Sequence, residues 1–210
     1  VLNEAELAAI SQQRLPVATL STQVAVEACA GGLSSALDAL CQAAEEAVRG
    51  GAQVLVLSDR VDSAGAAAPL TATSVAMPPL LSVGAVHHHL LRQKLRLRCS
   101  LVVDTAQCWS THHMACLIGY GASAVCPWLT WETIRHWLVH PKTQKRIEQG
   151  KLEALTAAKA QANVRLALEN GLRKILSKIG ISLLASYHGA QIFEAIGLGA
   201  DVIARAFTGT

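Results

Sequence analysis

The chain is 210 residues long, 51% of them hydrophobic, and its 18 basic and 15 acidic residues leave a formal net charge of +3. This length suits one large α/β domain or two small ones, and folding would bury roughly 70% of the unfolded surface. No apolar run reaches the roughly 18 uncharged residues of a membrane-spanning helix, and the charges are too dispersed to bind a phosphate backbone. We therefore expect a soluble protein with no membrane or nucleic-acid partner.

The N-terminal part of the chain alternates between strand-like and helix-like segments. Residues 15–22 are apolar and β-branched, and residues 53–58 form a continuous Val/Leu run of strand length. Between them, residues 33–49 carry apolar side chains at helical spacing and end at Gly50. A strand that is apolar on both faces is typical of a parallel sheet covered by helices. The pattern predicts a strand–helix–strand unit.

The middle of the chain repeats this unit after a long loop. Residues 62–78 are rich in alanine, proline and hydroxyl side chains, which predicts a loop. The segments that follow predict in turn a helix, a strand, a helix and a strand, at residues 80–95, 100–103, 110–120 and 122–126. Successive units of this kind predict an α/β fold with a parallel sheet and right-handed crossovers.

The C-terminal part of the chain is mainly helical. Residues 130–139 predict a short helix, and residues 142–179 predict a long charged one. Gly150 and the Asn170–Gly171 pair are expected to break the long helix into pieces. A further helix is expected over residues 190–195, and a last apolar segment ends at Phe207.

Polar side chains follow the expected strands at their carboxyl ends, where ligands usually bind α/β sheets. They are Ser21, Thr22, Ser58, Asp59, Arg60, Asp104, Thr105 and Gln107. In one interpretation they line a catalytic crevice, and an independent barrel enzyme would use Asp59, Arg60 and Asp104 there. In the other, which we prefer, they cap the following helices and neutralise one another as Asp/Arg pairs. We expect no catalytic, cofactor-binding or metal-binding residue in this chain.

Eight histidines raise the question of a metal site. Glu132, His136 and His140 are spaced four residues apart, which places them on one face of a helix that continues that far. Pro141 argues against a regular final turn. The other histidine runs direct their rings apart on a helix: His87, His88, His89, His112 and His113. We expect buried or surface histidines rather than ligands.

The six cysteines form no C-x-x-C pair and lie mostly in apolar segments, which indicates reduced, buried thiols in an intracellular protein. They are Cys29, Cys41, Cys99, Cys108, Cys116 and Cys126. Cys108 is the candidate nucleophile, because a helix start lowers the pKa of a thiol and His112 lies four residues on. No third group is evident to orient that histidine. A structural role at a tight strand-to-helix turn is the preferred interpretation.

The sequence has no G-x-G-x-x-G and no Walker A motif for phosphate. The glycines of residues 119–121 and 197–199 are interpreted as helix ends. The densest basic cluster is Arg92, Lys94, Arg96 and Arg98. It alternates with uncharged residues where a helix is followed by a strand, which indicates a solvated rim.

Residues 105–122, TAQCWSTHHMACLIGYGA, closely resemble the central domain of glutamate synthases, in their ferredoxin-dependent form. Four further segments match this family in order and spacing, namely LSDR at 57–60, AMPPLL at 76–81, KIGIS at 178–182 and SYHGAQIFEA at 186–195. The resemblance covers nearly the whole chain. The start at Val1 and the end at Thr210 then indicate cuts through a longer polypeptide.

The resemblance implies a polypeptide with a glutamine amidotransferase domain, this central domain, an FMN barrel that also carries a 3Fe-4S cluster, and a β-helix. Such an enzyme makes glutamate from glutamine and 2-oxoglutarate with reduced ferredoxin, and ammonia passes between its sites through a tunnel. The nucleophilic cysteine, the FMN contacts and the cluster ligands belong to other segments, so no cofactor is implied here. The implied partners are the amidotransferase and FMN domains, with ferredoxin for the whole enzyme, in cyanobacterial cytoplasm or plastid stroma.

Within this family the central domain is similar to an incomplete TIM barrel that holds the active domains in register. We expect residues 1–180 to be a partial central domain and residues 181–210 to be its end, leading toward the FMN domain. The sequence departs from the family at Asp104, where glutamate is usual, at His188, where lysine is common, and in the alanine-rich residues 62–68. The alternative is a free-standing scaffold or interaction protein derived from that domain.

Overall fold

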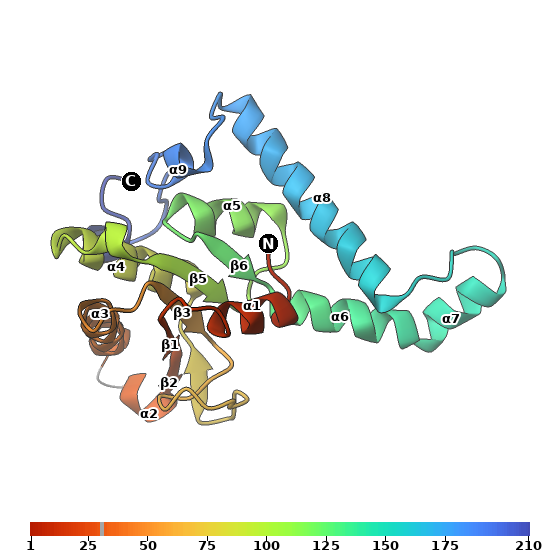
Figure 1. Cartoon of the computed structure of the whole chain (residues 1–210), viewed down its shortest axis with the longest axis horizontal. Helices are drawn as coiled ribbons and strands as arrows, with labels where there is room; N and C mark the ends of the chain where they lie inside the picture. The colour runs from red at the N-terminus through yellow and green to blue at the C-terminus, as the bar shows by residue number, and fades with distance from the viewer. Residues whose placement is uncertain (30–31) are drawn as a thin grey trace.

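The structure, a computed structural model, describes residues 1–29 and 32–210 (Figure 1). Four parallel strands form its main sheet in the order β1-β3-β5-β6. Their bounds are β1 Val17–Ser21, β3 Val54–Ser58, β5 Ser100–Asp104 and β6 Ala124–Cys126. The predicted α/β fold with a parallel sheet is confirmed. Over the described ranges the sheet stays open, as in an incomplete barrel.

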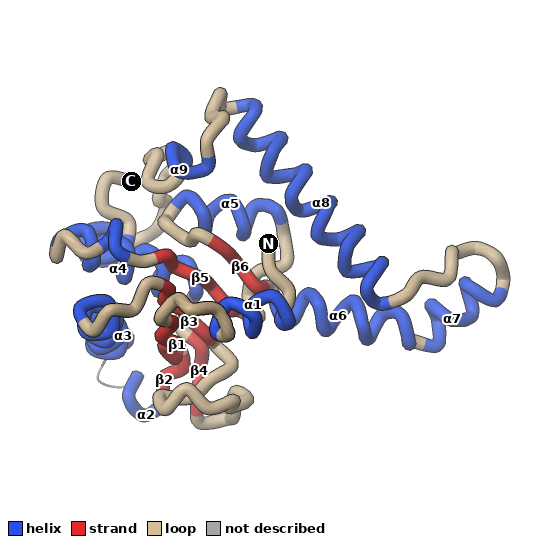
Figure 2. The backbone as a smooth tube through the Cα atoms, viewed as in Figure 1, coloured by secondary structure: helices blue, strands red, loops and turns tan. Residues whose placement is uncertain are grey.

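Helices flank this sheet and also project from it (Figures 1 and 2). They are α1 Glu4–Ser11, α2 Val26–Cys29, α3 Leu33–Arg49, α4 Pro79–Arg92, the short 3-10 helix η1 Arg96–Arg98, α5 Thr111–Gly119, α6 Trp128–Val139, α7 Pro141–Glu148, α8 Ala157–Lys178, α9 Leu184–Tyr187 and α10 Ala200–Ala206. Two short strands, β2 Gln23–Ala25 and β4 Ser74–Ala76, pair antiparallel. Helices α6 and α7 extend away from the sheet, and α8 returns to the body beside α5.

The two faces of the sheet are covered differently. Leu55, Leu57 and Leu101 point into the larger core with α3, α4 and α5. Their neighbours along the strands, among them Val56 and Val102, point to the opposite face, where side chains of the N-terminal segment and α1 cover them. Successive strand residues alternate between faces, so burial of both faces requires the continuous apolar runs seen in the sequence.

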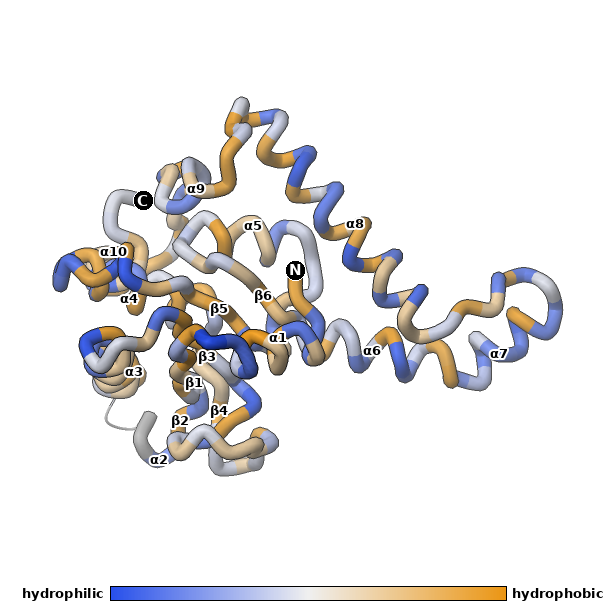
Figure 3. The backbone as a smooth tube through the Cα atoms, in the orientation of Figure 1, coloured by the Kyte–Doolittle hydropathy of each residue, from blue (hydrophilic) through white to orange (hydrophobic). Residues whose placement is uncertain are grey.

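Helix α8 continues through Asn170 and Gly171, so the break expected there is wrong. A β-carbon on Gly171 would lie 2.7 Å from Oγ1 of Thr111, at the start of α5. Glycine therefore allows the two helices to approach closely and does not mark a turn. The break expected at Gly150 is confirmed, because α7 ends at Glu148 and the chain turns there with a φ of 67°. Figure 3 shows polar and apolar residues alternating along α8, as a helix with one packed face requires.

Two other expectations differ from the structure, and one helix was not expected. Residues 62–78 are not entirely loop, because β4 pairs with β2. No helix forms over residues 190–195, where Gln191 has a φ of 54° and Phe193 packs against the ring of Tyr120. Helix α1 was not predicted, and the side chains of Asn3 and Glu6 cap its first turn reciprocally.

Gly84 lies where α4 crosses α10. A β-carbon at this position would lie 2.3 Å from the carbonyl oxygen of Ala206, closer than packed atoms allow. We expect Gly84→Ala to lower the free energy of unfolding by about 2 kcal/mol, measured by denaturant titration. As a control, Gly50→Ala would meet a carbonyl oxygen at 3.3 Å with an ordinary backbone and should change stability by less than about 1 kcal/mol. Equal losses in the two variants would contradict the close crossing.

Candidate functional site

The carboxyl ends of the four parallel strands form one aligned row. Ser21 pairs in register with Ser58, Ser58 with Asp104, and Asp104 with Cys126. The parallel register therefore brings together polar residues that are up to 83 positions apart (104 − 21). The predicted rim at this edge of the sheet is confirmed, and the bonds within it decide what it can do.

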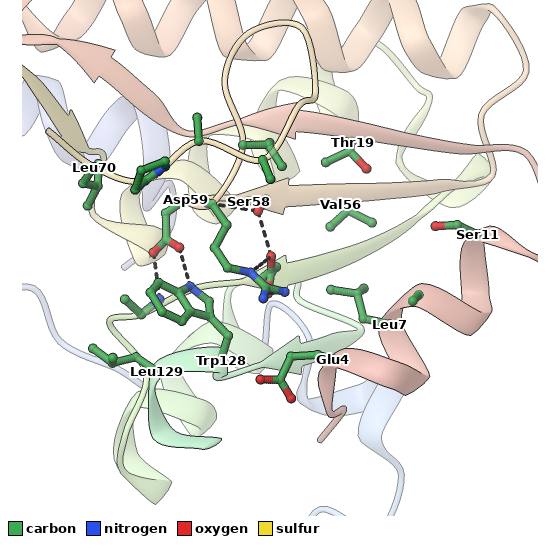
Figure 4. A pocket seen from close by; sticks show the side chains of 18 residues that line it. Glu4, Leu7, Ser11, Thr19, Val56, Ser58, Asp59, Leu70, Trp128 and Leu129 are labelled. Atoms are coloured by element: carbon green, nitrogen blue, oxygen red, sulfur yellow. Dashed lines mark hydrogen bonds and ion pairs between the residues drawn. The ribbon is translucent and has the colours of Figure 1, made fainter. Parts of the chain in front are cut away.

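Asp104 is the centre of the first group of bonds, which includes the hydroxyl of the labelled Ser58 (Figure 4). Its carboxylate accepts from Nε and Nη2 of Arg60, both at 2.9 Å, and from the hydroxyl of Ser58 at 2.7 Å. The guanidinium of Arg60 also lies over the indole of Trp128, 5.5 Å from the ring centroid. Burial alone would lower the pKa of Arg60, but the contact with Asp104 raises it above its ordinary value. This bidentate pair fixes both charges at the strand ends.

Asp59 is the centre of the second group. Its carboxylate accepts from the hydroxyl of Thr105 at 2.8 Å, the backbone N–H of Ala106 at 2.8 Å and the indole N–H of Trp128 at 2.6 Å. Only 3% of Asp59 is exposed. A carboxylate that accepts three internal hydrogen bonds has little capacity left to take a proton from a substrate. These three bonds fix the carboxylate of Asp59 at the strand ends.

The remaining rim residues connect the loop after β3 to the sheet. The hydroxyl of Ser21 donates to the carbonyl oxygen of Val61, and the side-chain amide of Gln23 donates to the carbonyl oxygens of Asp59 and Ala68. Thr22 is buried, and the backbone N–H of Gln107 donates to the hydroxyl of Thr105. The preferred interpretation, in which these polar groups satisfy one another, accounts for the arrangement.

A pocket of about 700 Å³ opens between α1, the strand ends and the loop after β3. Its walls are mainly apolar, with Leu7, Val56 and Leu70 among them, and Arg60 contributes part of its floor. Glu4 lies at its edge. Burial of Glu4 would raise the pKa of its carboxyl, but hydrogen bonding to Arg135 outside the pocket lowers it overall. The pocket thus offers apolar surface and a neutralised guanidinium, and no acid–base pair among the described residues.

Sequence reasoning missed two residues of this site, Glu4 and Trp128. Trp128 follows the last strand after a single residue, Pro127, so it stands at the same edge as the predicted rim. That position was a usable signal, since the carboxyl ends of parallel strands share one edge. Glu4 gave no signal, because nothing in its segment indicated that α1 would lie against the sheet.

The cysteine candidate is not arranged for catalysis. Cys108 is completely buried, and burial raises the pKa of its thiol to about 12. His112 instead contacts Cys116, with Nε2 3.5 Å from Sγ, and burial raises the pKa of that thiol as well. A thiol must ionise to attack, so neither is activated near neutral pH. The described cysteine side chains are unpaired, and the side chain of Cys29 lies outside the described part of the chain.

The histidine and carboxylate candidates for a metal site do not converge. Glu132 bonds Arg135, and His140 ends α6 and accepts from the backbone N–H of Lys142 instead of continuing the helical face of His136. Within residues 1–29 and 32–210, no three His, Cys, Asp or Glu side chains form a group that could hold a metal ion. Elsewhere His89 bonds Glu45, and His113 stacks edge-on against Trp109.

Arg96 does not follow the expectation of a solvated basic rim. Its guanidinium donates to Nδ1 of His87 at 2.9 Å and to the carbonyl oxygens of Cys99 and Gly121, both at 2.7 Å. Burial lowers the pKa of Arg96. The expectation holds for the other three members of the cluster, which are exposed: Arg92, Lys94 and Arg98. Arg96 joins α4, the start of β5 and the turn before β6.

We expect the stability of the fold to depend on pH through His87, whose Nδ1 accepts from Arg96. Burial, assisted by the charges of Arg96, His88 and His188, lowers the pKa of His87 to about 3. In the unfolded chain the value is about 6.5, so between these limits the unfolded state binds more protons and stability falls as the pH falls. We expect a loss of about 2 kcal/mol between about pH 7 and pH 5, measured by denaturant titration.

The matched variants of this prediction are His87→Gln and His136→Gln. Glutamine at position 87 can accept from Arg96 but does not titrate, so the slope of stability against pH should decrease. His136 is exposed, and its variant should keep the full slope. An unchanged slope in His87→Gln would assign the pH dependence to other groups.

Comparison with known proteins identifies the family of this chain. The family model described as the glutamate synthase central domain matches residues 1–199. The chain belongs to the glutamate synthase central domain family. Among its relatives are ferredoxin-dependent glutamate synthase 2 of Synechocystis sp., 55% identical over 210 residues, and the ferredoxin-dependent glutamate synthase of Pyropia yezoensis, 51% identical over 210 residues. A chloroplastic/mitochondrial ferredoxin-dependent glutamate synthase 1 of Arabidopsis thaliana is 51% identical over 212 residues.

This central domain is a small part of those relatives. The matches cover 100% of the chain but 13% of each relative. Among solved structures, a flavocytochrome b2 variant with sulfite bound aligns with 97% of the chain and 43% of its own, at a TM-score of 0.53 and 11% identity. At this identity the likeness shows the α/β fold alone. In the described part of the domain, no helix has the length and apolar character to cross a membrane.

Proposed function

We propose that this central domain is a non-catalytic spacer in a ferredoxin-dependent glutamate synthase, which makes glutamate from glutamine and 2-oxoglutarate with reduced ferredoxin. It holds the amidotransferase and FMN domains of one polypeptide in register. The observation that supports the proposal is that Arg60 pairs with Asp104, while Asp59 accepts hydrogen bonds from Thr105, Ala106 and Trp128. The two carboxylates thus bond groups of the sheet and its loops, and Asp104 balances the charge of Arg60.

We also propose that the strand ends bind no flavin, the cofactor that the parent enzyme uses elsewhere. A flavin phosphate needs cationic side chains or free backbone N–H groups. Here Asp104 neutralises Arg60, Asp59 occupies the backbone N–H of Ala106, and Ser110 caps the start of α5. FMN and the 3Fe-4S cluster accordingly belong to other domains of the parent enzyme, and the chain brings no cofactor of its own.

The extent of the domain and its surroundings are part of this proposal. Residues 1–180 form the partial central domain, and residues 181–210 form its end, leading toward the FMN domain. The cyanobacterial and chloroplastic names of the relatives support a location in cyanobacterial cytoplasm or plastid stroma. A free-standing scaffold is not favoured, since the curated relatives named above carry this domain inside a polypeptide about eight times longer.

The proposal is tested by looking for activities that a spacer lacks. The purified chain is titrated with FMN by flavin fluorescence, and its release of ammonia from glutamine is assayed. We expect no saturable flavin binding and no glutaminase activity above a buffer blank. Micromolar flavin binding or hydrolysis of glutamine would overturn the spacer role and favour an independent barrel enzyme.

A second test uses the full-length enzyme. Substitutions that leave the domain folded but alter its surfaces should affect transfer between sites more than chemistry at either site. We expect the ratio of glutamine-dependent to ammonia-dependent glutamate formation to decrease while FMN content stays constant. Loss of both activities in equal proportion in such folded variants would argue against a positioning role.

A further inference from the structure

Residues 191–198 form a segment without regular structure between α9 and α10. No backbone N–H or carbonyl group of these residues makes a hydrogen bond to another described residue. Pairing ends with the N–H of Ala190, which donates to Tyr187, and resumes at Gly199, whose carbonyl oxygen accepts from Val202. Backbone groups of a folded protein are nearly always paired or solvated, so this run is available to pair with a neighbouring chain segment.

The side chains of the same segment are apolar and exposed. Ile196 is 86% exposed, Leu198 46% and Ile192 41%. Its one charged side chain is Glu194. Scattered exposed apolar residues are common, but three within seven positions of an unpaired backbone mark a contact surface. We call residues 191–198 the unpaired strap.

The unpaired strap is held in place by its inner side. Phe193 stacks on the ring of Tyr120 with centroids 5.7 Å apart and packs edge-on against Tyr187. Just before it, the backbone N–H of Gly189 donates to the carbonyl oxygen of Gly119 at 2.8 Å. An anchored segment with its apolar side chains directed outward loses little conformational entropy on binding, which favours docking.

We propose that the unpaired strap packs against a neighbouring domain of the same polypeptide, which covers its apolar side chains and pairs its backbone groups. Two observations favour this occupant. The chain matches 13% of the length of relatives that align with all of it, so in those relatives most of the polypeptide lies outside this domain. The strap also carries almost no charge, which suits a permanent apolar contact rather than a charged, transient partner. The inference rests on the proposed function and adds the surface that performs it.

The experiment measures amide hydrogen exchange in the full-length polypeptide by mass spectrometry. Peptides that cover residues 191–198 should exchange more slowly than the exposed loop at residues 151–156, on the order of tenfold. The reason is that a docked neighbour shields their N–H groups from water. Ile196→Glu should abolish this protection. Leu97→Glu is the matched control, because Leu97 is fully exposed outside the strap. It should leave the exchange of the strap unchanged.

Three outcomes would overturn the proposal. Exchange of the strap as fast as that of the 151–156 loop in the unsubstituted polypeptide would show that nothing covers it. Protection that grows with protein concentration would assign the contact to a second copy. Protection that appears only on adding phosphatidylglycerol vesicles would assign it to a membrane surface. None of these results bears on flavin binding or glutaminase activity, so the proposed function stands or falls separately.

Discussion

Replacing Asp59 by alanine is expected to lower the free energy of unfolding by about 4 kcal/mol. The substitution removes a buried carboxylate and leaves the hydroxyl of Thr105, the N–H of Ala106 and the indole N–H of Trp128 without their acceptor. Each hydrogen bond to a charged group contributes more than a neutral one, and buried donors left unpaired add their desolvation cost. Urea titration followed by circular dichroism gives the value.

Two further variants test this account of Asp59. Asp59→Asn keeps the size of the side chain but presents an NH₂ group to donors, so about half of the loss should remain. Asp38→Asn is the matched control, because Asp38 is an exposed carboxylate paired with Arg205. Such surface pairs contribute little, and a change below about 1 kcal/mol is expected. If Asp59→Ala left the free energy of unfolding unchanged, the strand-end network would not be what holds the sheet together.

Replacing Arg96 by methionine is expected to cost about 3 kcal/mol. Methionine retains most of the aliphatic volume but loses the donors to His87 and to the carbonyl oxygens of Cys99 and Gly121. These bonds connect three separate segments, so the turn before β6 should also loosen. Urea titration measures the stability, and faster amide exchange at Ala122 and Ser123 would report the local effect.

The control for this prediction is Arg98→Met. Arg98 belongs to the same short helix, η1, and carries the same charge, but its side chain is exposed. Its replacement should change stability by less than about 0.5 kcal/mol. If both variants lost stability equally, net charge rather than the buried bonds of Arg96 would be responsible.

The sheet and its polar edge were predictable from the sequence because both follow from strand order. Continuous Val/Leu runs require burial of both faces, and parallel register then places Ser58 beside Asp104. The pairing of Arg60 with Asp104 follows from opposite charges at neighbouring strand ends. For this part of the molecule, local pattern and long-range structure agree.

The remaining features depend on contacts between segments that are far apart in sequence. Gly171 and Asn170 carry a local signal for a turn, but packing against Thr111 decides that α8 continues. The burial of Arg96 depends on two carbonyl groups presented by other segments. The role of Trp128 depends on its indole N–H, which donates to Oδ1 of Asp59, 69 positions earlier in the chain. Local propensity is weak compared with such tertiary contacts.

The position of the N-terminal segment and α1 has a geometric consequence for closure of the sheet into a barrel. Leu2, which precedes α1, and Leu7 and Ile10 of α1 pack against Val56 and Val102 on one face of the sheet. In an eight-stranded barrel that space is filled by side chains of the strands alone and has no room for a helix. Closing this open sheet into such a barrel would therefore require the N-terminal segment to leave that face.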